Sequence, residues 1–199
     1  MEMKRKAVFL DRDGTLNADA AYASRYEQIA VYPESYKAVR SLNQGGLLAV
    51  VVTNQSAVGR GLLSEGDLKE IHARLAAAFA VQGARLDAIY FCPHYPQSSD
   101  PRYAKECNCR KPKTGLALRA AADLGIDLES SYVIGDKTED ILFGVNIGAL
   151  PVLVLTGSGR ESLERLREIG LQPAHVATNV LRAADWILHM EGRKSHDPL

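Results

Sequence analysis

Short apolar runs alternate along the chain with stretches that carry an apolar residue at every third or fourth position. The apolar runs have the length and the β-branched or aromatic content of buried strands, and they cover residues 7–10, 47–52, 88–91, 132–134 and 152–155. The stretches with helical spacing cover residues 33–43, 64–81, 114–124, 139–145 and 161–169. This alternation predicts an α/β fold with a doubly wound, Rossmann-like, mostly parallel sheet. In such a fold, ligands bind beyond the carboxyl ends of the strands.

The length of the chain limits its organisation. At about 150 residues per domain, the 199 residues make one compact unit. We expect a single domain over residues 1–190 without a large cap domain, and a polar, flexible tail over residues 191–199. Ser64 and Asp67 have the spacing of a capping box, which predicts a helix start at that point. The segment 93–113 shows neither the pattern of a strand nor that of a helix, which predicts a long loop.

Balanced charge argues against two classes of partner. The 24 basic and 24 acidic residues leave a formal net charge of +0, so no overall field attracts nucleic acid or an anionic membrane. No apolar run approaches the roughly 18 residues of a membrane-spanning helix, and the first run is too short for the core of a signal peptide. We therefore expect a cytoplasmic protein that binds neither nucleic acid nor membrane. We also expect it to be a monomer.

Acidic residues follow two of the predicted strands. Asp11 and Asp13 come directly after the first strand, and Asp136 comes after the fourth. Carboxylates held this close together repel one another unless a cation or a shared proton relieves the repulsion. We expect that cation to be Mg²⁺. Considered alone, the first pair also fits an ordinary turn at Gly14.

Groups suited to binding phosphate lie at other strand ends. The hydroxyl and amide side chains that follow the second strand are Thr53, Asn54, Gln55 and Ser56. They precede a glycine-rich turn whose backbone amides also suit phosphate oxygens. Lys111 lies just before the third long helix, from where it can reach across the crevice. Each segment alone could be a simple polar turn, but together they predict a site for a phosphate group.

The long loop carries a complete set of metal ligands. The donors are three thiols and one imidazole, from Cys92, His94, Cys107 and Cys109. Three cysteines within one short window do not suit a disulfide framework, whereas four protein ligands in a tetrahedral set suit a structural Zn²⁺. We expect the zinc-bound loop over residues 92–109 to be rigid and thereby to fix Arg110 and Lys111, which directly follow it.

All of these motifs, in this order and over nearly the whole chain, resemble those of the haloacid dehalogenase-like phosphohydrolases. The resemblance implies that Asp11 is the nucleophile and Asp13 the general acid and base. It also implies that Thr53 and Lys111 hold the transferring phosphoryl group. The implied Mg²⁺ ligands are Asp11, Asp136 and Asp13, the last through its backbone carbonyl.

The zinc loop narrows the resemblance to a branch shared by heptose-bisphosphate and histidinol-phosphate phosphatases. Segment 54–61, with a serine after Asn-Gln and an Arg-Gly pair, looks like the heptose group. The resemblance implies removal of the 7-phosphate of D-glycero-D-manno-heptose 1,7-bisphosphate through an aspartyl-phosphate, in lipopolysaccharide precursor synthesis. The residues implied to contact this substrate are Asp19, Tyr22, Asn54, Gln55, Ser56, Arg60, Arg110 and Lys137.

Three other functions stay open. Histidinol-phosphate phosphatase activity is the alternative within enzymes. A receiver-like switch domain also carries acids, a threonine and a lysine at strand ends, but it gains nothing from a general acid such as Asp13, because it needs a durable acyl phosphate. The third is a zinc-stabilised binding module with an inactive site.

Overall fold

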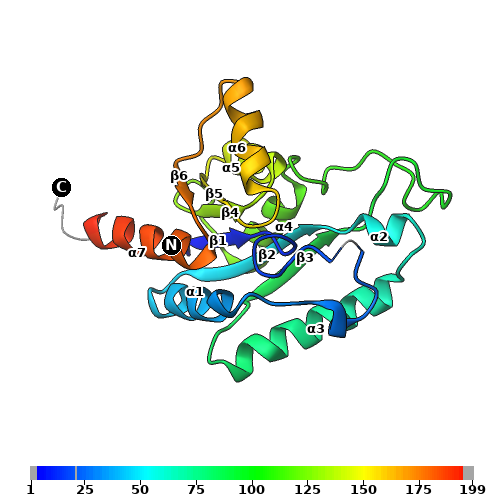
Figure 1. Cartoon of the computed structure of the whole chain (residues 1–199), viewed down its shortest axis with the longest axis horizontal. Helices are drawn as coiled ribbons and strands as arrows, with labels where there is room; N and C mark the ends of the chain where they lie inside the picture. Colours follow the sequence, from blue (N-terminus) through cyan, green and yellow to red (C-terminus); the bar gives the residue numbers. More distant parts are fainter. Residues whose placement is uncertain (1–3, 21, 195–199) are drawn as a thin grey trace.

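The computed structural model describes residues 4–20 and 22–194, with side chains up to residue 192. Its strands form one six-stranded sheet in the order β3-β2-β1-β4-β5-β6, and every neighbouring pair is parallel. The strands are β1 (Ala7–Leu10), β2 (Leu48–Asn54), β3 (Ala88–Cys92), β4 (Tyr132–Gly135), β5 (Leu150–Val154) and β6 (His175–Ala177). The predicted α/β, doubly wound fold is therefore confirmed (Figure 1).

Helices cover both faces of the sheet (Figure 1). Helices α1 (Pro33–Gln44), α3 (Glu65–Val81) and α7 (Val180–Lys194) pack on one face. Helices α4 (Gly115–Leu124), α5 (Thr138–Asn146) and α6 (Gly159–Glu168) lie on the other, and the short α2 (Ser56–Gly59) and η1 (Tyr26–Gln28) lie in the connections. Within the described ranges, no helix combines the length and the apolar character needed to cross a membrane.

Strand β1 shows why the sheet is buried on both sides. Val8 and Leu10 point into the core beneath α1, α3 and α7, whereas Ala7 and Phe9 point into the core beneath α4 and α5. All four side chains are fully buried. A strand that is apolar at every position cannot show a period of two, and this explains why it appears in the sequence as a short continuous run.

The structure adds two elements that the sequence analysis did not predict. β6 is only three residues long, too short to stand out as an apolar run. The buried residues of α7 have helical spacing, so the sequence does contain an apolar helical pattern that the sequence analysis did not identify. These residues are Val180, Ala183, Ala184 and Ile187. Because α7 runs to Lys194, residues 191–194 continue a helix and do not form the expected tail. The rest of that tail lies outside the described residues.

The longest connections of the fold follow the carboxyl ends of strands. The carboxyl ends of β2, β1 and β4 lie side by side, since these strands are neighbours in the sheet. After β3, as predicted, a long loop without helix or strand extends to α4 (Figure 1). At the start of α3, Ser64 and Asp67 form the predicted capping box, with the Asp67 N–H donating to Ser64 Oγ at 3.0 Å.

Candidate active site

Three buried carboxylates meet at the carboxyl ends of β1 and β4. Asp11 follows β1, Asp136 follows β4, and Asp140 lies in the first turn of α5. One oxygen of each lies within 4.8 Å of the others, and the three residues are at most 5% exposed. We call these residues the acidic cluster. The sequence analysis did not assign Asp140 to the site, although its place four residues after Asp136, at a helix start, was a usable signal.

Burial raises the pKa values of two of these acids. Asp11 reaches a pKa of about 6, because burial outweighs the nearby charge of Lys111. Asp136 reaches about 7, because burial and the charges of Asp11 and Asp140 act together. A divalent cation would relieve both effects, and carboxylate oxygens are the donors that Mg²⁺ prefers. The acidic cluster therefore fits a Mg²⁺ site.

The orientation of Asp136 is set by its neighbours. Thr15 Oγ1 donates to Asp136 Oδ1 at 3.3 Å, and the Ser158 N–H donates to Oδ2 at 2.8 Å. Gly14 has a φ of +89°, and a Cβ at that position would overlap the Asp136 carboxylate. The glycine is therefore needed both for the turn after β1 and for the space that Asp136 occupies.

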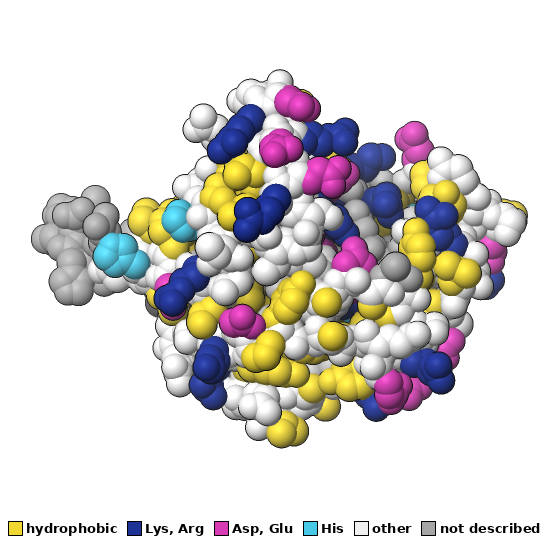
Figure 2. All heavy atoms as spheres, in the orientation of Figure 1, with side chains coloured by type: hydrophobic (Ala, Val, Ile, Leu, Met, Phe, Trp, Pro, Cys, Tyr) yellow, Lys and Arg dark blue, Asp and Glu magenta, His cyan; other side chains and the backbone are white. Residues whose placement is uncertain are grey.

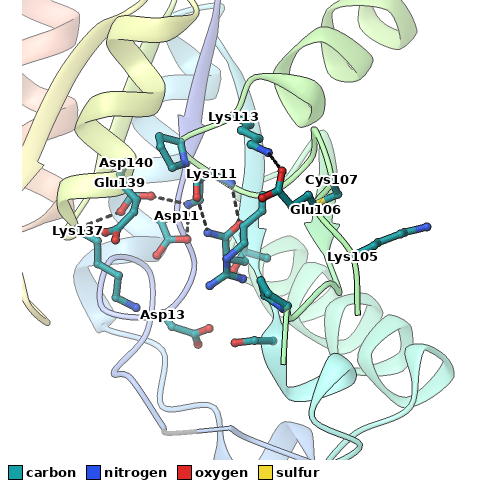
Figure 3. A pocket seen from close by; sticks show the side chains of 16 residues that line it. Asp11, Asp13, Lys105, Glu106, Cys107, Lys111, Lys113, Lys137, Glu139 and Asp140 are labelled. Atoms are coloured by element: carbon teal, nitrogen blue, oxygen red, sulfur yellow. Dashed lines mark hydrogen bonds and ion pairs between the residues drawn. The ribbon is translucent and has the colours of Figure 1, made fainter. Parts of the chain in front are cut away.

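Lys111 forms ion pairs with two members of the acidic cluster. Its Nζ donates to Asp11 Oδ1 at 2.7 Å, to Asp140 Oδ1 at 2.5 Å and to the Val52 carbonyl at 2.7 Å. Figure 3 shows Lys111 between Asp11 and Asp140, with Asp13 apart from them. Burial alone would lower the pKa of Lys111, but the charges of Asp11 and Asp140 outweigh it, and the net pKa is raised. The lysine thus remains a buried positive charge.

Asn54 holds the backbone of Lys111 in place. Its Nδ2 donates to the Lys111 carbonyl at 3.2 Å, and its Oδ1 accepts from the Lys111 N–H at 3.0 Å. Asn54 is the last residue of β2, so this pair of hydrogen bonds fastens the lysine to the sheet. The amide therefore positions a site residue, whatever contact it makes with substrate.

The carboxylate of Asp13 points away from the acidic cluster and into a group of donors. It accepts from Arg12 Nε and Nη2 at 3.0 and 2.7 Å, from Asn17 Nδ2 at 2.9 Å and from Gln55 Nε2 at 2.8 Å. Burial acts to raise the pKa of Asp13, but the charge of Arg12 and these hydrogen bonds outweigh it, and the net pKa lies below the usual value. In this arrangement Asp13 is ionised at neutral pH and can accept a proton.

Arg12 is itself fixed by a buried histidine that the sequence analysis did not connect to the site. Arg12 Nη1 lies 3.1 Å from His72 Nε2, and Nη2 donates to Gln55 Oε1 at 3.1 Å. Burial and the charge of Arg12 lower the pKa of His72 to about 3. The imidazole is therefore neutral and accepts a hydrogen bond from Arg12.

Two adjoining pockets open beside these residues. The first has a volume of about 540 Å³ and includes Asp11, Thr53 and Lys111 in its lining; the second has about 340 Å³. Asp13 lines both. Seven of the predicted substrate contacts line these pockets. Arg110 lines only the first pocket, and Asp19, Tyr22 and Gln55 line only the second. The residues that line both are Asn54, Ser56 and Lys137. Figure 2 shows basic and acidic side chains interspersed over this face, so the recognition of an anion rests on local groups.

Arg60 is not among the described residues that line either pocket. Its guanidinium lies 3.8 Å from the centre of the Tyr95 ring and 5.3 Å from the centre of the Tyr22 ring. Nearby, Lys137 Nζ lies 3.5 Å from Asp19 Oδ2, so this pair joins two of the predicted substrate contacts.

The predicted zinc ligands also come together. Cys92 Sγ lies 3.3 Å from Cys109 Sγ and 3.6 Å from Cys107 Sγ, and His94 Nδ1 lies 3.1 Å from Cys109 Sγ. All four donor atoms lie within 4.8 Å of one another, a set that fits a tetrahedral Zn²⁺. Arg110 Nη1 donates to the His94 carbonyl at 3.3 Å, which links this Cys/His cluster to the first pocket.

Comparisons with known proteins give a consistent result. A model of the HAD-hydrolase-like family matches residues 108–183. The D-glycero-beta-D-manno-heptose-1,7-bisphosphate 7-phosphatase of Haemophilus ducreyi is 43% identical over 78% of this chain and 86% of its own length. The D-glycero-D-manno-heptose-1,7-bisphosphate 7-phosphatase of Thermosynechococcus vestitus is 39% identical over 93% of this chain and 96% of its own.

Similarity extends to the structure. A crystal structure of D,D-heptose 1,7-bisphosphate phosphatase from B. bronchiseptica, complexed with magnesium and phosphate, matches with a TM-score of 0.82 at 33% identity. The match covers 93% of this chain and 99% of that one. Likeness over this much of the chain favours an enzyme over a receiver-like switch or a binding module. The chain belongs to the D-glycero-D-manno-heptose-1,7-bisphosphate 7-phosphatase family of haloacid dehalogenase-like hydrolases, and it is a phosphoric monoester hydrolase.

Proposed function

We propose that this chain is a Mg²⁺-dependent phosphatase that removes the 7-phosphate of D-glycero-D-manno-heptose 1,7-bisphosphate through an aspartyl-phosphate on Asp11. The observation that carries the proposal is the buried contact between Asp11 and Lys111, 2.7 Å apart at the wall of the first pocket. The names of the relatives supply the substrate, and the B. bronchiseptica structure, which holds magnesium and phosphate, supports the metal.

Asp11 is suited to attack phosphorus. In the first step one of its carboxylate oxygens forms a bond to phosphorus, the bond from phosphorus to the sugar oxygen breaks, and that oxygen leaves with the bonding electrons. Lys111 would neutralise charge on the phosphoryl oxygens, since its ammonium already lies beside the attacking carboxylate. Thr53, which lines the same pocket, would help to hold the phosphoryl group.

Asp13 would move protons in both steps. It would give a proton to the departing sugar oxygen and later take one from the water that hydrolyses the aspartyl-phosphate. Its ionised form, held by Arg12 and Gln55, suits the second role. For the first role the carboxyl group must be protonated, so we infer that it leaves Arg12 when substrate binds.

The metals would be held by separate residues. Asp11, Asp136 and the backbone carbonyl of Asp13 would hold Mg²⁺, with Asp140 beside them. When bound, Mg²⁺ supplies positive charge that offsets the repulsion between a carboxylate nucleophile and a phosphate dianion. The structural Zn²⁺ would be held by Cys92, His94, Cys107 and Cys109.

The second phosphate of the substrate needs its own cations. Arg110 and Lys137 line the first pocket, and we propose that they bind this phosphate, while Asp19, Tyr22 and Ser56 contact the sugar or its phosphates. A role in lipopolysaccharide precursor synthesis goes with this substrate. Residence in the cytoplasm, a monomeric state and a single domain over residues 1–190 remain predictions from the sequence.

The decisive test measures phosphate release from the α and β anomers of the bisphosphate and from histidinol phosphate, with and without Mg²⁺. We expect Mg²⁺-dependent turnover of the bisphosphate, and no turnover by the Asp11→Asn variant. Asp185→Asn, which changes an exposed acid on α7, is the matched control and should behave like the wild type. Faster hydrolysis of histidinol phosphate would show that the proposed substrate is wrong and that histidinol phosphate is the preferred one.

A further inference from the structure

A stack of three side chains joins segments that are far apart in the sequence. The guanidinium of Arg60 lies over two aromatic rings, 3.8 Å from the centre of Tyr95 and 5.3 Å from the centre of Tyr22. Tyr22 belongs to the connection between β1 and α1, Arg60 directly follows α2, and Tyr95 lies in the long loop, next to the zinc ligand His94. We call Tyr22, Arg60 and Tyr95 the arginine stack.

One side of the arginine stack rests on a closely packed base. Gly59 is buried, and a Cβ at that position would lie 2.8 Å from both the Pro93 carbonyl oxygen and the Tyr95 Cβ. The end of α2 therefore packs directly against the backbone of the long loop. Arg60 follows that contact, and its backbone N–H donates to the Ser56 carbonyl at 2.9 Å. This packing fixes the backbone of Arg60, from which the side chain with its guanidinium extends.

The other side of the stack holds a residue with a strained backbone. Tyr22 has a φ of +72°, in the left-handed region that a bulky residue rarely adopts. Its side chain lines the second pocket together with Asp13, Asp19 and Lys137. A conformation of this kind persists only where surrounding contacts favour it, and the ring of Tyr22 lies against Arg60.

We propose that Arg60 is a positioning residue, which holds Tyr22 at the wall of the second pocket by stacking on the base that Tyr95 provides. The inference rests on the proposed function, and it assigns Arg60 a role different from direct contact with a phosphate. The position of its guanidinium, in contact with two aromatic rings and outside the lining of both pockets, carries the proposal. Because Tyr22 lines the second pocket and Asp11 lines only the first, the arginine stack acts on substrate binding rather than on the chemical step.

The experiment measures kcat and KM for heptose 1,7-bisphosphate and for p-nitrophenyl phosphate. Arg60→Met keeps the length of the side chain and removes the planar cation. We expect it to raise KM for the bisphosphate about five- to tenfold, which corresponds to the free energy of a cation–π contact, with kcat within about twofold of the wild type. The small phosphate ester has no second part to reach Tyr22, so its kcat/KM should be unchanged.

Variants of Tyr95 separate positioning from direct phosphate binding. Tyr95 lines neither pocket. If Arg60 works through the stack, Tyr95→Leu should raise KM as Arg60→Met does, Tyr95→Phe should restore the wild-type KM, and the Arg60→Met/Tyr95→Leu double variant should be no worse than either single one. Arg119→Met, which removes an arginine stacked on Tyr90 away from both pockets, is the matched control.

The outcomes are distinguishable. If the wild type hydrolyses the bisphosphate but Tyr95→Leu leaves its KM unchanged while Arg60→Met raises it, then Arg60 contacts the substrate directly and the proposal is wrong. An unchanged KM in Arg60→Met also overturns the proposal and leaves the proposed function intact. If the wild type does not hydrolyse the bisphosphate at all, the proposed function is wrong and this inference fails with it.

Discussion

At the scale of single residues, Asp140 is the site residue whose role is most sharply testable. It shares the Lys111 ammonium with Asp11, and it also accepts the Lys137 N–H at 3.0 Å, which caps α5. Asp140→Asn removes the charge and keeps the shape. Because the ammonium is then less firmly held beside Asp11, we expect kcat to fall about 10- to 100-fold, as for other residues that orient a catalytic group.

The neighbouring acid offers the control. Glu139 lies on the same turn of α5 and lines the first pocket, but it is exposed and outside the acidic cluster. Glu139→Gln should therefore keep kcat close to the wild-type value. Equal losses of kcat in both variants would show that general charge near the pocket, and not the contact with Lys111, decides the rate.

His72 should make stability depend on pH. Its pKa is lowered from 6.5 to about 3 in the folded chain, first by burial and then by the charge of Arg12. As pH falls through 6.5, His72 takes up a proton in the unfolded chain but stays neutral in the folded chain. The stability that His72 contributes is therefore present above pH 6.5 and is lost toward pH 3. Between pH 7.5 and 5 we expect a loss of about 2 kcal/mol.

Urea unfolding at the two pH values checks this expectation. His72→Gln keeps a side-chain acceptor for Arg12 but does not titrate. The difference in unfolding free energy between variant and wild type should therefore shift by the same amount between pH 7.5 and 5. This difference removes the contributions of Asp11 and Asp136, which titrate in both proteins. If wild type and variant had equal pH dependence, His72 would not remain neutral as the structure implies.

At the scale of elements, the long loop carries the Cys/His cluster, and Arg110 and Lys111 directly follow it. Cys107→Ala removes one ligand of the Cys/His cluster. We expect it to release zinc and to lower kcat/KM at least about tenfold, because Arg110 and Lys111 are no longer held by the loop. The Mg²⁺ affinity should change little, since Asp11 and Asp136 lie on other elements.

Zinc content by metal analysis, turnover and Mg²⁺ binding are measured on the same preparations. Ser99→Ala, in the same loop but outside the Cys/His cluster, is the control and should keep both zinc and activity. Full activity in zinc-free Cys107→Ala would mean that the loop does not need the metal to hold Lys111. The hydrogen bonds from Asn54 to the backbone of Lys111 would then suffice.

The elements also show what the sequence could predict. Strand ends could be found from apolar runs, and parallel strands bring their ends to one edge, so the proximity of Asp11 and Asp136 was predictable. The contact of Arg12 with His72 joins residues 60 positions apart through the packing of α3 on the sheet. Hydrophobic periodicity reports which face is buried but does not say which residues of two elements will touch. The arginine stack was hidden for the same reason.

At the scale of the whole molecule, metal binding and folding stability should be linked. Without a cation, the acidic cluster destabilises the folded state. Burial disfavours the charged forms of Asp11 and Asp136 and raises their pKa values to about 6 and 7. Mg²⁺ that binds only the folded chain stabilises it by about 2.7 kcal/mol at 100 times its dissociation constant. We therefore expect Mg²⁺ to raise the thermal midpoint of the wild type.

Protons compete with the metal for the same oxygens, and this sets the direction of the pH effect. At pH 8 both carboxyl groups are ionised, so Mg²⁺ should raise the midpoint fully. At pH 5.5, below both pKa values, binding must displace protons, and the shift at the same Mg²⁺ concentration should be much smaller. Thermal unfolding with and without Mg²⁺ at the two pH values measures this. Asp136→Asn should lose the Mg²⁺-dependent shift at pH 8, whereas Asp185→Asn should keep it; a shift that survived in Asp136→Asn would place the cation elsewhere.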